Sequence, residues 1–362
     1  MTAAFASHSR RWAYYGRPNI MNTKGTIQLT SWGLLISILH ANFDGLASPA
    51  CPKPPLAAEG DGSAVYLSGK RVTALQCTKE SITVSYTDTH TNEQESIEAE
   101  LVIGADGVHS TVRRLANAPF TERYAGYIAW RGTIPENLVS QETVQYFSDH
   151  LSLQFSKRTY LVCYIIPTET GNFEPGKRLL NWVWYYNVAE DSPEMKDIFT
   201  DINNEQHHNT VPRGLVRQEV WERCRAAVLP RISAPFQELL QKTSSPFVTK
   251  IRDVICTSAS FCDGRVVLVG DAFTTLRPHI GVATEQAAFH SNTLEAVYRG
   301  EKTPEAWGLE VRRFAQRIIL INKIVAELLG QCSLCLNRSC PMPYLLSNLS
   351  FNKYKVDVLY FH

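Results

Sequence analysis

Two separate stretches of sequence decide how this chain is interpreted: LVIGADGVHS at residues 101–110 and GRVVLVGDA at residues 264–272. Each begins as an apolar run and ends in a turn that contains glycine and aspartate. Continuous apolar runs are typical of strands covered on both faces, and ligands of open α/β sheets bind where such strands end. We therefore expect Asp106 and Asp271 to follow two strands and to contribute to one ligand site.

The first turn has several features that suit a bound cofactor. Gly104 and Gly107 remove side chains where a backbone must approach a ligand. Ser110 is a natural N-cap for the helix that follows, and Arg113 is a residue type that pairs with phosphate. The alternative is that Asp106 only closes the turn.

The second stretch is followed by RPHIG at residues 277–281 and then by a helical pattern. Asp271 is placed to accept hydrogen bonds from ribityl or ribose hydroxyl groups. A helix N-terminus offers free N–H groups and partial positive charge, which suits the pyrimidine edge of a flavin. An ordinary strand–turn–helix with a capping aspartate is the alternative, but a plain turn does not need the RPHIG run.

Composition sets broad limits on the chain. Its 362 residues are 44% hydrophobic and 20% charged, enough for about two domains. A net charge of +1 gives no field that selects nucleic acid or an anionic membrane, and no run is long and apolar enough to span a bilayer. The nine cysteines form no small-protein framework, so we expect mostly reduced thiols, no metal site and a cytoplasmic protein. A basic, acid-poor N-terminus leaves a transit peptide as the alternative.

Hydrophobic periodicity predicts the secondary structure. The predicted helices span residues 30–43, 213–229, 234–242, 282–299 and 305–329. The predicted strands span residues 64–68, 71–76, 81–87, 95–103 and 247–256, with further strands in the aromatic segment 125–187.

The expected fold class is α/β with an α+β insert. A Rossmann-like dinucleotide-binding domain is predicted from residues 1–118 and 250–300, and a mixed-sheet substrate domain is inserted at residues 119–249. Residues 301–362 are predicted to form C-terminal helices and an irregular tail.

The two stretches together resemble motifs of the class A FAD-dependent aromatic hydroxylases. GADGVHSTVR at residues 104–113 resembles the family motif whose aspartate contributes to FAD and NAD(P)H binding. GDA at 270–272, with Pro278 and Gly281, resembles the motif that holds ribityl and pyrophosphate. YAGYIAWRG at 124–132 is similar to the branch of the family that hydroxylates dihydroxypyridines. The resemblance covers roughly residues 25–330.

One family feature has no counterpart in this sequence. The family begins with a strand, a Gly-x-Gly-x-x-Gly turn and a helix that seats the FAD pyrophosphate. The nearest string here, GDGSAV at residues 60–65, lacks the third glycine. The chain is therefore expected to start after the first βαβ unit of the family, as a truncated chain, and a degenerate member that does not hold FAD is the alternative.

The resemblance implies an enzyme that uses FAD, NAD(P)H and O2 to hydroxylate a small aromatic or hydroxypyridine-like substrate through a flavin C4a-hydroperoxide. A simple flavin reductase or oxidase is a further alternative. The partners expected are the substrate and O2, with no nucleic acid and no membrane, and a homodimer is also considered. The implied cofactor-binding residues are Asp106, Gly107, Arg113, Gly270, Asp271, Ala272, Pro278, Gly281, Val282 and Ala283.

The substrate and catalytic residues are predicted from residue type. Trp182, Trp184 and Tyr186 alternate along a strand and offer one face to a flat substrate, or they form ordinary sheet core. Arg131 pairs with an anionic substrate or with a carboxylate in the sheet. His279 is an acid–base candidate because imidazole titrates at about pH 6.5, and the alternative is a structural histidine.

Overall fold

The computed structural model of the chain describes residues 6–14, 17–156 and 159–330. The chain divides into two compact units. Unit 1 comprises the described residues within Met1–Pro55, Tyr124–Ile251 and Val325–His362. Unit 2 comprises Leu56–Arg123 and Arg252–Ile324.

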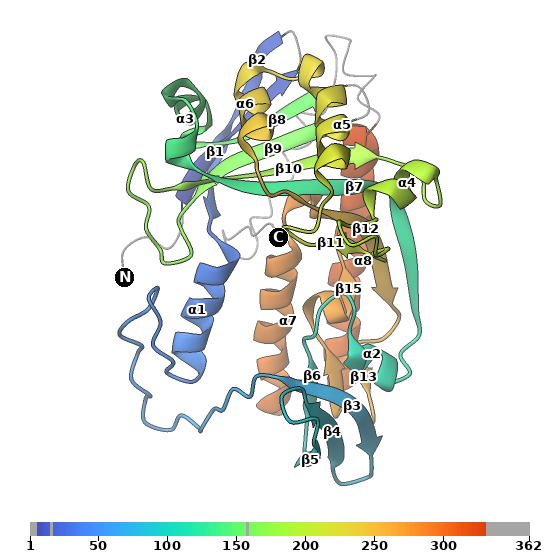
Figure 1. Ribbon diagram of the computed structural model, residues 1–362. Helices are drawn as coiled ribbons and strands as arrows, with labels where there is room; N and C mark the ends of the chain where they lie inside the picture. Colours follow the sequence, from blue (N-terminus) through green and yellow to red (C-terminus); the bar gives the residue numbers. More distant parts are fainter. Residues whose placement is uncertain (1–5, 15–16, 157–158, 331–362) are drawn as a thin grey trace. The chain divides into compact units, whose positions relative to one another are not determined.

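Unit 1 is built on a sheet with the strand order β11-β12-β7-β10-β9-β8-β1-β2. Its strands are β1 (Ala6–Tyr14), β2 (Arg17–Leu29), β7 (Phe120–Pro135), β8 (His150–Ser156), β9 (Thr159–Ile166), β10 (Leu179–Asn187), β11 (Thr210–Val211) and β12 (Phe247–Cys256). The start of β7, up to Arg123, and the end of β12, from Arg252, belong to unit 2. The strands β7, β10, β9 and β8 are antiparallel and lie side by side in Figure 1. Their aromatic and β-branched residues favour this pleated arrangement.

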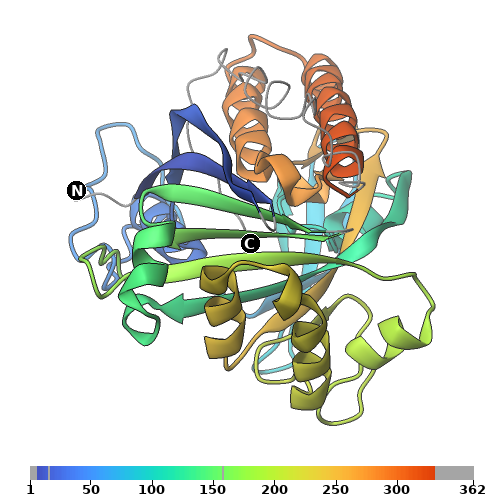
Figure 2. The same ribbon diagram turned by 90° about the horizontal axis from the view of Figure 1, so that it is seen from above.

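Helices cover one face of this sheet. The helices of unit 1 are α1 (Trp32–Phe43), α3 (Gln141–Phe147), α4 (Pro193–Ile198), α5 (Gln218–Val228) and α6 (Ala234–Lys242). Figure 2 shows α5 and α6 lying across the strands. Trp221 of α5 and Phe236 of α6 join Trp182 and Trp184 of β10 in one buried cluster. Because side chains alternate along a strand, the residues between these tryptophans face the opposite side of the sheet.

Unit 2 contains two small sheets and three helices. Its strands are β3 (Lys70–Cys77), β4 (Ile82–Asp88), β5 (Gln94–Ala99), β6 (Val102–Gly104), β13 (Ser260–Phe261), β14 (Val266–Leu268) and β15 (Thr274–Thr275). Its helices are α2 (Thr111–Leu115), α7 (Ala283–Tyr298) and most of α8 (Pro304–Gly330). β3, β4 and β5 form one antiparallel sheet, and β13, β14 and β6 form the other. β15 pairs instead with the end of β12. The apolar residues of β14 pack with Leu294 of α7 and Trp307 of α8.

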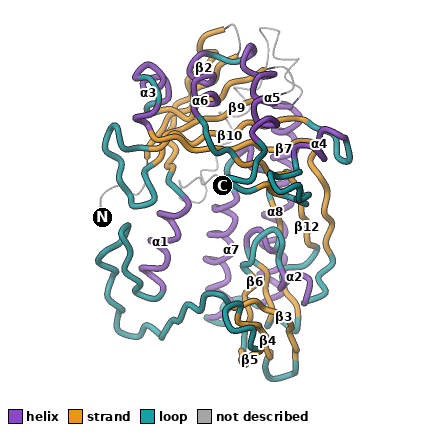
Figure 3. The backbone as a smooth tube through the Cα atoms, in the orientation of Figure 1, coloured by secondary structure: helices purple, strands orange, loops and turns teal. Residues whose placement is uncertain are grey.

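The structure confirms the α/β fold class and most of the predicted elements. α1 begins after the N-cap Ser31, whose hydroxyl accepts a hydrogen bond from the Leu34 N–H at 3.2 Å. The predicted strand 64–68 is wrong: residues 44–69 form a loop (Figure 3). Its apolar residues have no strand to pair with, and Val65 is 72% exposed. The single strand predicted at 95–103 is also wrong, because β5 and β6 belong to different sheets.

The grouping of the chain differs from the domain boundaries expected from the sequence. The described residues up to Pro55 belong to unit 1, because β1 pairs in parallel with β8 and extends its sheet. Residues 301–324 belong to unit 2, where Trp307 and Val311 are buried in its core. Within the described residues, no helix combines the length and apolar character that crossing a membrane requires.

The cysteines are only partly as expected. Cys51, Cys163, Cys224 and Cys256 are buried free thiols. Cys77 and Cys262, however, form a disulfide across 185 residues of sequence, which corrects the expectation of reduced thiols for this pair. It joins the end of β3 to the turn before β14, and the spacing of the cysteines in the sequence gives no sign of this proximity.

Candidate functional site

The two glycine-aspartate stretches lie on neighbouring parallel strands of unit 2. β6 and β14 pair in register from Val102 opposite Val266 to Gly104 opposite Leu268. The ladder continues with a hydrogen bond from the Val269 N–H to the Gly104 carbonyl at 3.0 Å. Because the strands are parallel, the loops that follow them leave the same edge of the sheet.

Asp106 is engaged by its own loop and helix. Its carboxylate accepts hydrogen bonds from the Ser110 hydroxyl at 2.5 Å and from the N–H groups of Thr111 at 2.6 Å and Val112 at 3.0 Å. The structure therefore shows the turn-closing role that was the alternative for Asp106. A contact between this residue and a cofactor stays a prediction.

The two glycines of this motif have different roles. A Cβ added to Gly104 would lie 2.7 Å from a Leu268 methyl carbon and 2.8 Å from a Val112 methyl carbon. Gly104 is thus required by packing within unit 2, and the approach of a ligand to its backbone stays a prediction. Gly107 has φ of 75°, and an added Cβ would meet no atom within 4 Å. Its backbone conformation, which other residues adopt with strain, is the reason for glycine at this position.

Arg113 connects the two loops. Its guanidinium donates to the Ala272 carbonyl at 2.9 Å and to the Val108 carbonyl at 2.6 Å. The side chain is buried at 3% exposure, and burial lowers its pKa. Arg113 therefore fixes the first motif against the second, and a contact between this residue and a phosphate stays a prediction.

Asp271 lies in a short 3₁₀ turn, Gly270–Ala272, directly after β14. Its Oδ1 atom is buried and has no hydrogen-bond partner among the described residues. Burial raises the pKa of this carboxyl to about 6. Buried polar atoms of native proteins are nearly always hydrogen-bonded, so this oxygen is a candidate acceptor for a donor on a ligand.

Two side chains that the sequence analysis did not single out support the Asp271 loop from α7. His290 accepts a hydrogen bond from the Gly270 N–H at 3.0 Å, and burial lowers its pKa to about 4, so it stays neutral. Gln286 donates to the Thr274 carbonyl at 2.7 Å. The two residues are four positions apart, so they lie on one face of α7. This spacing is visible in the sequence and could have indicated a shared role.

The RPHIG run leads into the N-terminus of α7. Pro278 opens a 3₁₀ turn that ends at Gly281, where φ is 68°. Val282 is the N-cap residue and Ala283 is the first residue of α7, and no side chain caps this helix. The first N–H groups of a helix have no partner within it. The predicted cofactor residues Pro278, Gly281, Val282 and Ala283 therefore form an uncapped helix start that follows the Asp271 loop.

His279 does not behave as an ordinary imidazole. Burial and the neighbouring Arg277 guanidinium lower its pKa to about 3. Arg277 itself forms a two-point ion pair with Asp253 at 2.8 and 2.6 Å. His279 is thus neutral at physiological pH, and the titration at about pH 6.5 on which its acid–base role was based does not apply.

Unit 1 contains a cavity of about 410 Å³ on the sheet face opposite the covering helices. Its floor is formed by side chains of three neighbouring strands. These are Arg131 and Thr133 of β7, Asn181, Val183 and Tyr185 of β10, and Tyr164 and Ile166 of β9. A volume of this size is typical of small-molecule sites.

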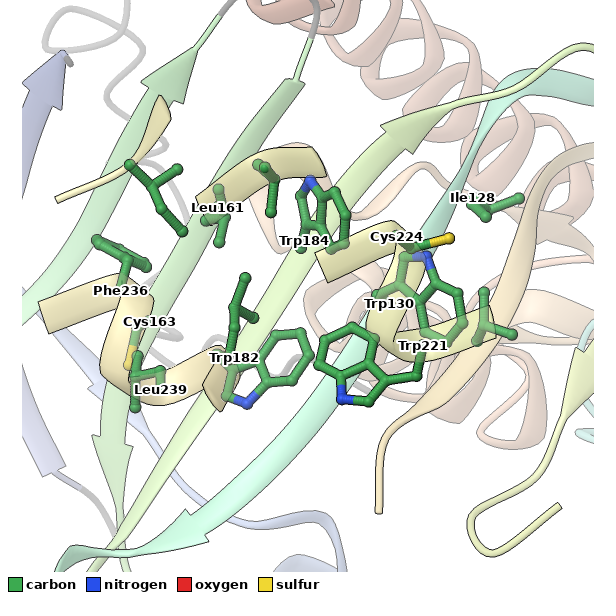
Figure 4. Packing of buried hydrophobic residues seen from close by; sticks show 14 of the residues in the cluster. Ile128, Trp130, Leu161, Cys163, Trp182, Trp184, Trp221, Cys224, Phe236 and Leu239 are labelled. Carbon is green, nitrogen blue, oxygen red and sulfur yellow. The ribbon is translucent and has the colours of Figure 1, made fainter. Parts of the chain in front are cut away.

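The aromatic residues predicted to face a substrate lie in the core. Trp182 and Trp184 are each 1% exposed, and Trp182 stacks on Trp221 with ring centroids 5.9 Å apart (Figure 4). Tyr186 is half-buried and donates to Glu194 at 2.5 Å. The structure thus places Trp182 and Trp184 in the sheet core, with Tyr186 packed against it. Trp182 also lines the cavity, and a contact between these residues and a substrate stays a prediction. The cavity floor is formed by the alternate residues of β10, those between and beside the tryptophans. The alternation of side chains along a strand does not itself indicate which of the two sets the helices cover.

Comparison with known proteins agrees with this architecture. A family model described as FAD binding domain-like matches residues 124–253. The structure of 2,6-dihydroxypyridine-3-hydroxylase from Arthrobacter nicotinovorans superposes with a TM-score of 0.71 at 23% identity, over 91% of this chain and 78% of that one. The chain has the fold of the FAD-dependent aromatic hydroxylases. A salicylate hydroxylase substrate complex is also similar, with a TM-score of 0.60 at 15% identity, over 91% of this chain and 76% of that one.

The curated relatives confirm the resemblance to these flavin hydroxylases. The 2,6-dihydroxypyridine 3-monooxygenase of Paenarthrobacter nicotinovorans is 31% identical over 271 residues, which cover 72% of this chain. The chain spans 62% of the length of that relative. The 2-heptyl-3-hydroxy-4(1H)-quinolone synthase of Pseudomonas aeruginosa is 24% identical over 190 residues, or 52% of this chain and 41% of the relative.

Proposed function

We propose that this chain is an FAD-dependent monooxygenase that hydroxylates a small aromatic or hydroxypyridine-like molecule with NAD(P)H and O2. The observation that carries the proposal is the Asp271 carboxylate, which presents a buried, unpartnered Oδ1 directly after β14. The resemblance to flavin hydroxylases supports FAD as the ligand that completes it. A cytoplasmic location and a homodimer stay predictions.

The residues after β14 fit the cofactor. Asp271 would accept a hydrogen bond from a ribityl hydroxyl group, which satisfies its buried oxygen. The uncapped N-terminus of α7, from Val282 and Ala283, would favour the negative charge that the pyrimidine ring gains on reduction. Bound FAD would supply the redox chemistry, taking a hydride from NAD(P)H and activating O2.

The remaining parts of the proposed site hold these groups in place. Arg113 and His290 fix the Gly270–Ala272 turn from two sides, so that Asp271 is positioned before a ligand arrives. The cavity of unit 1 would receive the substrate, because it is large enough for one aromatic ring with substituents. Excluding water from such a cavity protects the activated oxygen from side reactions.

The test is a turnover experiment with isotopically labelled O2. Purified chain, FAD and NADH or NADPH are mixed with 2,6-dihydroxypyridine, the compound in the name of the relative. The proposal predicts a product that carries one labelled oxygen atom. Consumption of NAD(P)H with peroxide as the sole product would indicate a flavin reductase or oxidase. A colourless chain that gains no flavin would indicate a family member that does not hold FAD.

A further inference from the structure

One face of α8 carries a local concentration of positive charge. Residues 311–326 contain four basic residues and no Asp or Glu. The basic residues are Arg312, Arg313, Arg317 and Lys323, and the side chains of all four are exposed. The expectation of no membrane partner rests on the net charge of the whole chain, +1, and that number does not reveal this cluster.

The charges of this cluster are not neutralised by ion pairs. Within residues 17–156 and 159–325, no acidic side chain forms an ion pair with any of the four. Other cations close to them in the sequence are paired, since Arg299 contacts Glu295 at 2.5 Å and Lys302 contacts Glu310. Glu310, the acid that directly precedes the basic segment, is thus already occupied by a lysine.

α8 packs against the rest of unit 2 through its other face. Trp307, Val311 and Ala315 are each at most 2% exposed and belong to the core cluster of this unit. Phe314 stacks on Phe289 of α7 with ring centroids 4.4 Å apart, and the two helices lie side by side in Figure 2. This packing fixes which side of α8 is presented outwards.

An apolar strip runs along the exposed face. Leu309, Leu320 and Ile324 are 52%, 61% and 51% exposed. Leu309 and Leu320 lie about three turns apart, and Ile324 follows after about one further turn, so the three lie nearly on one line along the helix. Scattered exposed apolar residues are ordinary on a protein surface, but these three are aligned.

The basic residues surround this strip. At about 100° per residue, Arg312 and Lys323 project on one side of Leu320 and Arg317 projects on the other. Arg313 lies along the strip, between Leu309 and Leu320. The long stems of such residues can extend along an apolar surface while their charged ends reach a polar layer. The exposed face of α8 is therefore apolar at its centre and cationic around it.

An anionic lipid surface matches both features of this face. The phosphate groups of lipid headgroups accept charge-assisted hydrogen bonds from arginine and lysine. The boundary between headgroups and acyl chains takes up the apolar side chains of a helix that lies in the plane of the interface. A nucleic acid would match the charge through its phosphates, but its backbone offers no apolar region to Leu320 and Ile324.

We propose that the exposed face of α8 binds the surface of a bilayer that contains anionic phospholipid. Leu309, Leu320 and Ile324 enter the acyl boundary, and the four cations lie at the level of the headgroups. The contact is peripheral, with the helix parallel to the membrane. It uses none of the residues of the proposed FAD site, so it is independent of the proposed function.

Sedimentation of the full chain with lipid vesicles tests the inference. Vesicles of phosphatidylcholine with about one third phosphatidylserine are compared with vesicles of phosphatidylcholine alone. We expect the partition coefficient to be at least about tenfold higher for the anionic vesicles and to fall as salt is raised, because salt screens surface charges. Equal partition onto both kinds of vesicle, or no binding to the anionic ones, would overturn the inference.

Paired variants assign the binding to α8. Arg313→Gln with Arg317→Gln removes two charges from the helix. The control, Arg71→Gln with Lys79→Gln, removes two exposed charges from β3 and the turn after it. We expect the α8 variant to lose at least about tenfold in partition and the control to stay close to the wild type. An equal loss in both variants would show a general effect of net charge and would also overturn the inference.

A second pair of substitutions tests the apolar strip. Leu320→Gln with Ile324→Gln keeps every charge, and we expect it to weaken binding even at high salt, where the apolar contact dominates. An unchanged partition in this variant contradicts insertion into the bilayer. Retention of the wild type on double-stranded DNA or polyglutamate as tightly as on vesicles would indicate a general polyanion site instead. If a variant does not fold, the comparison of vesicles and the salt dependence of the wild type decide.

Discussion

At the scale of single residues, Asp271 combines a structural cost with a proposed role. Its carboxyl is buried without a partner for Oδ1, and its pKa is raised from 3.8 to about 6. The folded chain therefore binds this proton more tightly than the unfolded chain does. The free energy of unfolding consequently falls as pH rises from the unfolded to the folded pKa, and the loss is complete above about pH 6.

Asp271→Asn is expected to remove this pH dependence. A shift of about two pKa units corresponds to about 3 kcal/mol, so the flavin-free variant gains up to that amount over the wild type at neutral pH. Near pH 4, where the wild-type carboxyl is protonated, the two proteins have similar stability. Urea denaturation of both proteins at both pH values measures the difference in the free energy of unfolding. If this free energy depends on pH in the same way in the variant and the wild type, the raised pKa of Asp271 is contradicted.

A substitution of Trp184 distinguishes a role in the sheet core from a role in substrate binding. It is 1% exposed and its Nε1 donates to the Thr159 hydroxyl at 2.7 Å. Trp184→Phe loses this bond and some volume, so we expect a destabilisation of about 1–3 kcal/mol and an unchanged KM. Asn181→Ala, on the cavity face of the same strand, is the matched control and should raise KM. A higher KM with unchanged stability in Trp184→Phe would favour the substrate interpretation.

At the scale of secondary-structure elements, the Cys77–Cys262 disulfide joins β3 to the turn before β14. The turn has positive φ at Cys262, Asp263 and Gly264, so its conformation is closely defined at the entry to the strand that carries Asp271. The disulfide therefore fixes the start of β14, the strand that leads to Asp271.

Cys77→Ser is expected to lower the free energy of unfolding by about 2–4 kcal/mol, since a cross-link over a long loop restricts the unfolded chain. A chemical reductant should have the same effect on the wild type and none on the variant. Denaturation with and without reductant measures this, and peptide mass mapping identifies the bond. Two free thiols at these positions in protein purified without reductant would contradict the prediction.

The elements show what local pattern can predict. α1, α6, α7 and β12 were predicted within about two residues, because periodicity and caps are local signals. The break between β5 and β6 was not predicted, because strands that are distant in the sequence determine which sheet each of them joins. The same limit applies to residues 64–68, where strand propensity is present but a partner strand is absent.

At the scale of the whole molecule, some residues of the proposed site are contained in contiguous sequence motifs, and others are brought together only by the tertiary fold. Asp271 and the start of α7 were predicted because the strand-end motif and the RPHIG run are contiguous in sequence. Tyr164 and Asn181 were not predicted, since their place in the cavity depends on the register between β9 and β10. The structural roles of Gly104 and Arg113 also depend on tertiary neighbours that no motif specifies.

The central claim for the molecule is that the loop after β14 and the start of α7 hold FAD. Titration of the purified chain with FAD, followed by visible absorbance and flavin fluorescence, tests it most directly. We predict saturable binding at one FAD per chain, and at least a tenfold weaker affinity for Asp271→Ala, whose lost hydrogen bond to FAD is worth about 1.5–3 kcal/mol. A wild type that binds no flavin, or an Asp271→Ala variant that binds it as tightly as the wild type, would contradict the claim.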